Sequence, residues 1–70
     1  MEREDNNMTV FFTEGNEQYI CENNVLRGGV LTTPVNYVHG KIFNGEPAQF
    51  ELPDGSFFTT THKVCKIMSH

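Results

Sequence analysis

AQFELPDGSFFTT, residues 48–60, contains the clearest local signal in the chain, because a tight turn there joins two alternating segments. Pro53 fixes φ at the second position of the turn, Asp54 suits the third, and Gly55 accepts a left-handed backbone at the fourth. This pattern is typical of a type I turn with a bulge, which connects two antiparallel strands. The sequence therefore predicts a β-hairpin whose reversal is centred on Pro53 and Asp54.

The turn also sets the pairing of the two strands. Counting outward from it gives three opposed pairs: Leu52 with Ser56, Phe50 with Phe58, and Ala48 with Thr60. We expect the Phe50–Phe58 pair to stabilise the hairpin by about 0.5–1.5 kcal/mol beyond the area that it buries. Alternation places Phe57 on the opposite face of the sheet, beside Glu51.

Period-two patterns extend the β prediction along the rest of the chain. Further short strands are expected in five segments: MTVFFT (8–13), QYICEN (18–23), VLRGGVLTT (25–33), NYVHGKIF (36–43) and TTTHKVCKIM (59–68). The glycines Gly28 and Gly29 indicate a bulge or a bend. The last segment forms either one strand or a 3₁₀ turn plus a strand, with Cys65 and Ile67 on one face. No window has a 3.6-residue period, so no helix longer than one turn is predicted.

The length of the chain allows one domain and limits its architecture. Residues 1–7, MEREDNN, are polar and without periodicity, and we expect a flexible tail there. Residues 8–70 are then a single small β-barrel domain, because an immunoglobulin-like sandwich needs about 100 residues and a barrel removes exposed edges. The predicted fold is all-β: an SH3-like barrel of about five to six strands, or a strongly curved antiparallel sheet.

The order of features in residues 36–68 resembles that of the SH3-like barrels. In that family a loop-rich first half leads into a three-strand meander, which is followed by a single 3₁₀ turn and a short closing strand. Here VHGKIFNG, EPAQFELPDG and SFFTTTHKV correspond to the meander, and CKIM corresponds to the closing strand. The peptide-binding SH3 domains have a Trp after their second strand. This chain has no Trp, so the binding of proline-rich ligands is not carried over.

Charge and cysteine content bear on location and partners. Nine acidic and five basic residues give a formal net charge of −4, whereas nucleic-acid modules usually present a basic patch. The sequence shows no apolar leader and no membrane span, which predicts a cytoplasmic protein without a membrane partner. In that reducing compartment we expect Cys21 and Cys65 to be small buried hydrophobes. A disulfide between them is the rarer alternative.

No motif for catalysis, for a cofactor or for a metal is found in the sequence. The cysteines and histidines do not follow metal-ligand spacing: Cys21, Cys65, His39, His62 and His70. A cysteine and a histidine brought together in space would form a nucleophilic pair, but a barrel of this size rarely also holds an oxyanion donor. The predicted protein is not an enzyme and has no cofactor and no metal site.

The strongest functional signal is an alternating stripe of aromatic and basic side chains. Four residues of the segment 36–43 fall on one face: Tyr37, His39, Lys41 and Phe43. We expect Phe57 to belong to this face and Phe11 to lie near it, both depending on the strand register. The alternative is that a loop partly covers Tyr37 or Phe43.

Exposed aromatic side chains with one or two bases are typical of protein-binding surfaces. The predicted function is a small cytosolic interaction module, of the adapter or inhibitor type, which binds a protein through this face. Binding of single-stranded nucleic acid by stacking on the same face is the alternative, and the net charge disfavours it. Homodimerisation that buries the exposed aromatics is left open.

Overall fold

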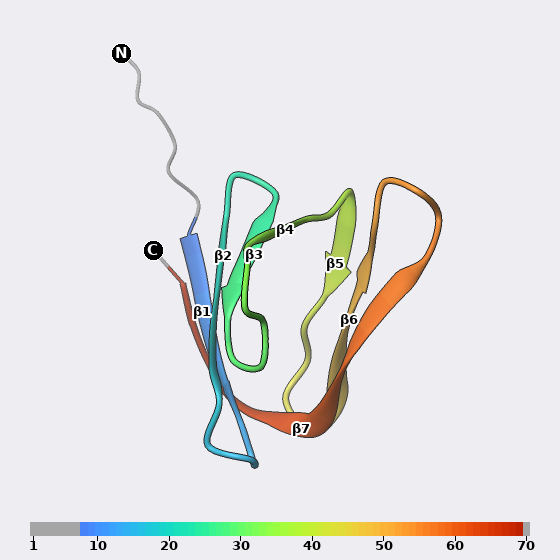
Figure 1. Ribbon diagram of the computed structural model, residues 1–70. Coiled ribbons are helices and arrows are strands. Elements are labelled where there is room, and N and C mark those ends of the chain that lie inside the picture. The colour runs from blue at the N-terminus through green and yellow to red at the C-terminus, as the bar shows by residue number, and fades with distance from the viewer. Residues whose placement is uncertain (1–7, 70) are drawn as a thin grey trace.

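Residues 8–69 are the residues that the computed structural model describes, and they contain seven strands and no helix (Figure 1). The strands are β1 (Met8–Thr13), β2 (Gln18–Glu22), β3 (Val25–Gly28), β4 (Val35–Asn36), β5 (His39–Lys41), β6 (Pro47–Glu51) and β7 (Phe57–Ser69). The predicted tail at residues 1–7 lies outside the described residues, as does His70. In this described part, no helix is long and apolar enough to span a membrane.

The strands pair antiparallel in the order β4-β3-β2-β1-β7-β6-β5 and form a curled half-barrel. β7 is 13 residues long and links the two halves of the curl. Its first half pairs with β6 and its second half with β1, so it bends along the base of the half-barrel (Figure 1). The all-β prediction is thus confirmed in its second form, a strongly curved antiparallel sheet.

The two edge strands of the sheet are consecutive in the chain. The Tyr37 N–H donates to the Asn24 carbonyl at 3.0 Å, and the Val38 N–H donates to the Glu51 carbonyl at 2.8 Å. The backbone therefore leaves the β3 side and joins the β6 side within two residues. Figure 1 shows β4 crossing the open end of the curl between β3 and β5. Both edges are short, which leaves little unpaired backbone for edge-to-edge association.

The predicted hairpin is confirmed with its register. Phe50 pairs with Phe58, and Glu51 with Phe57. The Leu52 N–H donates to the Ser56 carbonyl at 2.8 Å, and Gly55 has φ of 91°, a left-handed value that favours glycine.

Asp54 fastens this turn through its carboxylate. Oδ1 accepts the Ser56 hydroxyl at 2.6 Å and the Ser56 N–H at 2.9 Å, and these bonds lower the pKa of Asp54 from its ordinary value of 3.8. A pKa that is lower in the folded chain means that the carboxylate stabilises the fold above the unfolded value and loses this effect as the pH falls through the folded value.

We therefore expect the stability of the chain to fall below about pH 4, and Asp54→Ala to remove part of this fall. Urea midpoints at pH 7 and pH 3 for the two proteins measure the difference. An equal acid loss in the wild type and in the variant would show that the turn carboxylate contributes nothing.

The core lies on the concave side of the curl. Its largest fully buried side chains come from five strands: Tyr19, Phe11, Phe50, Leu26 and Val64. The Phe11 and Tyr19 rings stack at 5.0 Å, and Phe11 lies 6.1 Å from Phe50. The register that would place Phe11 near an exposed binding face therefore does not occur. Both faces of residues 8–13 carry apolar side chains, so the sequence pattern did not show which face is buried.

A β-bulge changes the phase of β7. Thr13 pairs with Val64 and Phe12 with Lys66, so Cys65 is the extra residue. Val64 and Ile67 consequently both face the core, whereas Cys65 is exposed. The predictions that Cys65 is buried and shares a face with Ile67 are wrong, because strict alternation does not hold across a bulge. Cys21 is buried as predicted, and both thiols are free.

The observed order of strands and turns agrees only in part with the expected SH3-like order. The meander β5–β6–β7 is present, and the end of β7 pairs with β1. β7, however, runs without a 3₁₀ turn, and residues 8–36 form the four paired strands β1 to β4. Seven strands are present where about five to six were predicted, partly because the chain bends after Tyr37 and divides the segment 36–43 between β4 and β5.

Candidate functional site

The outer face of β5–β6–β7 brings together most of the side chains that the sequence singled out. His39, Glu51 and Phe57 stand in register across the three strands, and the row of Lys41, Gln49 and Thr59 lies next to it. Alternation sends both rows away from the core, because the intervening row contains the buried Phe50. We call this surface the outer face.

The outer face has a shallow hollow of about 160 Å³. Its lining consists of His39, Lys41, Gln49, Glu51 and Phe57. The Phe57 side chain is 58% exposed, so a large apolar ring lies in water beside one cation, one carboxylate and one imidazole. Such an aromatic surrounded by polar groups is typical of the anchor residues in protein interfaces.

The structure separates Tyr37 from this group. Its ring packs edge-on against Phe50 with centroids 5.0 Å apart and planes at 62°, and Tyr37 belongs to the layer that covers the core. The alternation that grouped Tyr37 with His39 breaks where the chain crosses between the two edges, and Val38 becomes 54% exposed. The alternative of a partly covered side chain thus applies to Tyr37.

Phe43 stays in solvent but lies apart from the hollow. It follows the end of β5, is 58% exposed, and does not line the hollow of the outer face. Of the five predicted binding residues, the structure therefore gathers His39, Lys41 and Phe57 around one hollow.

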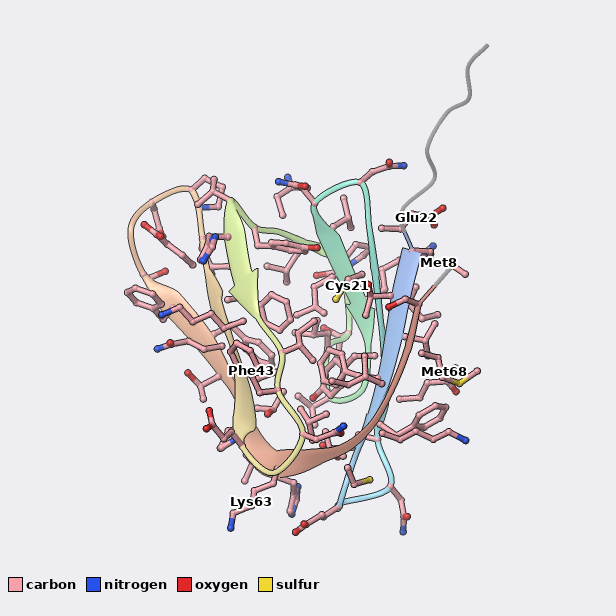
Figure 2. All side chains as sticks on the ribbon, turned by 180° about the vertical axis from the view of Figure 1, so that it is seen from behind. Met8, Cys21, Glu22, Phe43, Lys63 and Met68 are labelled. Atoms are coloured by element: carbon pink, nitrogen blue, oxygen red, sulfur yellow. The ribbon has the colours of Figure 1, made fainter. Side chains whose placement is uncertain are left out.

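A second and larger cavity, of about 390 Å³, opens at the mouth of the half-barrel, near the crossing of β4. We call it the mouth cavity. It is lined by Thr9, Cys21, Asn23, Asn24, Tyr37, Gly40, Ile42 and Phe50. Figure 2 shows Cys21 on the inner side of the curl, among the side chains that fill it.

The mouth cavity was not predicted from the sequence, although the sequence contains a signal for it. Thr9 pairs with Cys21, and Phe11 pairs with Tyr19 one layer deeper. Two small side chains thus stand above two large aromatic ones on the same inward-facing rows. The loss of side-chain volume between these layers leaves the hollow, but the pairing must be known before the layers can be compared.

Two ionisable groups inside the mouth cavity are kept neutral. Burial raises the pKa of Cys21 to about 11, although a hydrogen bond from Tyr37 acts in the other direction. Burial also raises the pKa of Tyr37 to about 12, and the neighbouring Cys21 adds to the shift. The Cys21 thiol is therefore protonated at neutral pH and is a poor nucleophile, since the thiolate is the reactive form.

We expect the two cysteines to differ sharply in reactivity. At pH 8, iodoacetamide should alkylate exposed Cys65 at least about a hundredfold faster than Cys21, because Cys21 is both buried and protonated. Mass spectrometry of peptides from a time course measures both rates. Comparable rates in the native chain, together with an unchanged circular-dichroism spectrum, would contradict the burial of Cys21.

The same shift predicts a pH effect on stability. A thiol whose pKa is higher in the folded chain stabilises the fold below its unfolded value, which is about 9, and loses this effect as the pH rises toward the folded value of about 11. Cys21→Ala should weaken the alkaline loss of stability between these values.

Groups that could hold a metal ion are absent from residues 8–69, where no three His, Cys, Asp or Glu side chains cluster. His62 instead faces Glu17, with Nδ1 and Oε1 3.7 Å apart, at the β1–β2 turn. Comparison of the chain with protein-family models, with curated proteins and with solved structures finds no match.

Proposed function

We propose that this chain is a protein-interaction module that binds its partner through the outer face of β5–β6–β7. The observation that carries the proposal is the 58% exposure of Phe57 in a hollow lined by His39, Lys41 and Glu51. An apolar side chain of the partner would pack on Phe57, and a partner carboxylate would pair with Lys41. Burial of one such aromatic anchor contributes about 2 kcal/mol or more to binding.

Charge favours a protein over a nucleic acid. Lys41 and Glu51 offset each other within the hollow, and the whole chain has a net charge of −4. Affinity for nucleic acid comes largely from neutralised phosphates, and this face offers Lys41 and His39 for that purpose. The exposed edges are also short, two residues in β4 and three in β5. Docking by side chains is therefore favoured over the addition of a strand at an edge.

The test compares partners retained by the wild type with those retained by two outer-face variants, Phe57→Ser and Lys41→Glu. Lys63→Glu is the matched control, because it makes the same charge change at an exposed position outside the hollow. Figure 2 shows Lys63 near the base of the half-barrel. Quantitative mass spectrometry should find a protein that the wild type and Lys63→Glu retain and that both outer-face variants lose.

Two results would overturn this proposal. In one, every retained protein binds the outer-face variants as well as it binds the wild type. In the other, a single-stranded oligonucleotide binds at micromolar concentration, the affinity falls steeply with salt, and Phe57→Ser abolishes it. The second result would establish the nucleic-acid alternative.

We also propose a fold family, a cellular location and an oligomeric state for this module. The β5–β6–β7 meander and the pairing of β7 with β1 support placing the fold among the SH3-like barrels. A cytoplasmic location agrees with two free thiols. A homodimer through the outer face would bury Phe57, and sedimentation at two concentrations, with Phe57→Ser as the control, measures it.

A further inference from the structure

The mouth cavity is separate from the outer face and does not take part in the proposed protein binding. The two hollows share no lining residue. Gly40 of β5 lies on the row that faces the core, whereas the side chains of His39 and Lys41 point outward. At about 390 Å³, the mouth cavity lies within the range of roughly 300–1,000 Å³ that small-molecule sites occupy. Barrel mouths are also among the places where such sites occur.

The shape of the mouth cavity follows from the small residues that line it. Gly40 pairs with Phe50 across β5 and β6, and a Cβ at Gly40 would lie 2.8 Å from two carbons of the Phe50 ring. The glycine thus lets the ring lie against the β5 backbone. Tyr37 is set edge-on to the same ring. Because Phe50 is only 1% exposed, the half-buried Tyr37 ring is the aromatic surface that the cavity offers, and the small side chains of Thr9 and Cys21 leave space beside it.

The lining is polar but carries no charge. Hydroxyl, thiol and amide groups come from Thr9, Cys21, Tyr37, Asn23 and Asn24, and none of the described residues that line the cavity is an acid or a base at neutral pH. The thiol and the phenol stay protonated. A charged ligand would lose its hydration without gaining a counter-charge, which is costly. The ligand that fits is therefore uncharged.

Two asparagine amides at the edge of the mouth cavity supply hydrogen-bond donors and acceptors. Asn23 and Asn24 have φ of 54° and 62° and form the two-residue turn between β2 and β3. Glycine suits such a turn at least as well, so the turn alone does not require two amides. A carboxamide offers a donor and an acceptor side by side, the geometry with which Asn pairs with the edge of a nucleobase.

We propose that the mouth cavity binds an uncharged nucleobase, whose flat ring lies against the Tyr37 ring and whose polar edge meets the amides of Asn23 and Asn24. Aromatic side chains stack on unpaired bases in this way. A free nucleoside and the exposed base of a single strand present the same chemistry. The absence of a cation from the described lining favours the nucleoside.

The test is an NMR titration of the full-length chain with adenosine, followed by AMP and by a short adenine-only single strand. Adenosine should shift the amide signals of Asn24, Gly40 and Cys21 in a saturable way. AMP should bind no more tightly than adenosine, because its phosphate meets no cation. A strand that shifts the same three signals more strongly than adenosine would support the site and identify a strand as the source of the base.

Matched glycine variants test the role of the amide. Asn24→Gly keeps a residue that accepts positive φ and removes the carboxamide, so adenosine should bind about three- to tenfold more weakly. Asn16→Gly is the control, because Asn16 also has positive φ, 63°, and lies in the β1–β2 turn outside the cavity. Its affinity for adenosine should equal that of the wild type.

Alkylation gives a readout that needs no variant. Saturating adenosine should slow the reaction of Cys21 with iodoacetamide about tenfold or more, while exposed Cys65 reports the unprotected rate in the same sample. The proposal is overturned if adenosine gives no saturable shift, if AMP binds more than tenfold more tightly than adenosine, or if Asn24→Gly and Asn16→Gly bind equally well. Loss of outer-face binding would leave all of these results unchanged.

Discussion

Phe50→Ala is expected to lower the free energy of unfolding by about 3–5 kcal/mol, the usual cost of removing a buried phenylalanine. The Phe50 side chain is 1% exposed and lies within 6.5 Å, between ring centroids, of Phe11, Tyr37 and Phe58. It links β6 to Phe11 of β1, so its removal leaves a cavity between the two halves of the curl. Since a chain of this length has a total stability of about 4–10 kcal/mol, much of the population should unfold.

Phe57→Ala is the matched control. It removes the same group seven positions along the chain, from a side chain that is 58% exposed, and should change stability by about 0.5 kcal/mol or less. Urea denaturation followed by far-UV circular dichroism measures both variants, because the chain has no Trp for fluorescence. Costs within 1 kcal/mol of each other would mean that the half-barrel is not built around Phe50.

Gly29→Ala is expected to destabilise the chain by about 2–5 kcal/mol, the sum of backbone strain and overpacking. Gly29 has φ of 55°, and a Cβ there would lie 2.0 Å from a carbon of the Tyr19 ring. Tyr19 is fully buried and stacks on Phe11, so it cannot move aside without disturbing the core. The Gly29 N–H also donates to the Gln18 carbonyl at 2.8 Å.

Gly45→Ala separates the two contributions. Gly45 has φ of 88°, and a Cβ there would meet no atom within 4 Å, so this variant experiences the strain without the clash. It should cost about 1–2 kcal/mol. The difference between the two variants, measured by the same denaturation, is the contribution of the contact with Tyr19. Equal costs would mean that the ring does not lie against Gly29.

The sequence correctly predicted those parts of the structure that depend on interactions between residues close together in the chain. The turn at Pro53 and Asp54 carries its own geometry, so the pairing of Phe50 with Phe58 followed from counting residues. The strand segments were also recognisable, because β-branched and aromatic residues alternate with polar ones between turn residues. On the outer face, the same alternation placed His39 and Lys41 on one side of their strand, and the hairpin register placed Phe57 beside Glu51.

Alternation failed as a guide where the sheet departs from regular pairing. One bulge at Cys65 exchanged the inner and outer sides of the following residues. Where the chain crosses between the two edges after Tyr37, the Tyr37 ring packs against the core and the Val38 side chain is exposed. In each case the irregularity changes the side of the side chains that follow it relative to those that precede it. Such irregularities depend on the partner strand, which is distant in the sequence.

The all-β class, the hairpin register and the outward row that contains Lys41 could be predicted from the amino-acid sequence, because they depend on turn chemistry and on a period of two residues. Three other features became clear from the folded chain: which face of β1 is buried, that Tyr37 points inward, and that a cavity remains beside Cys21. These features depend on how distant strands stack in layers, and the volume left between layers belongs to no single segment of the chain.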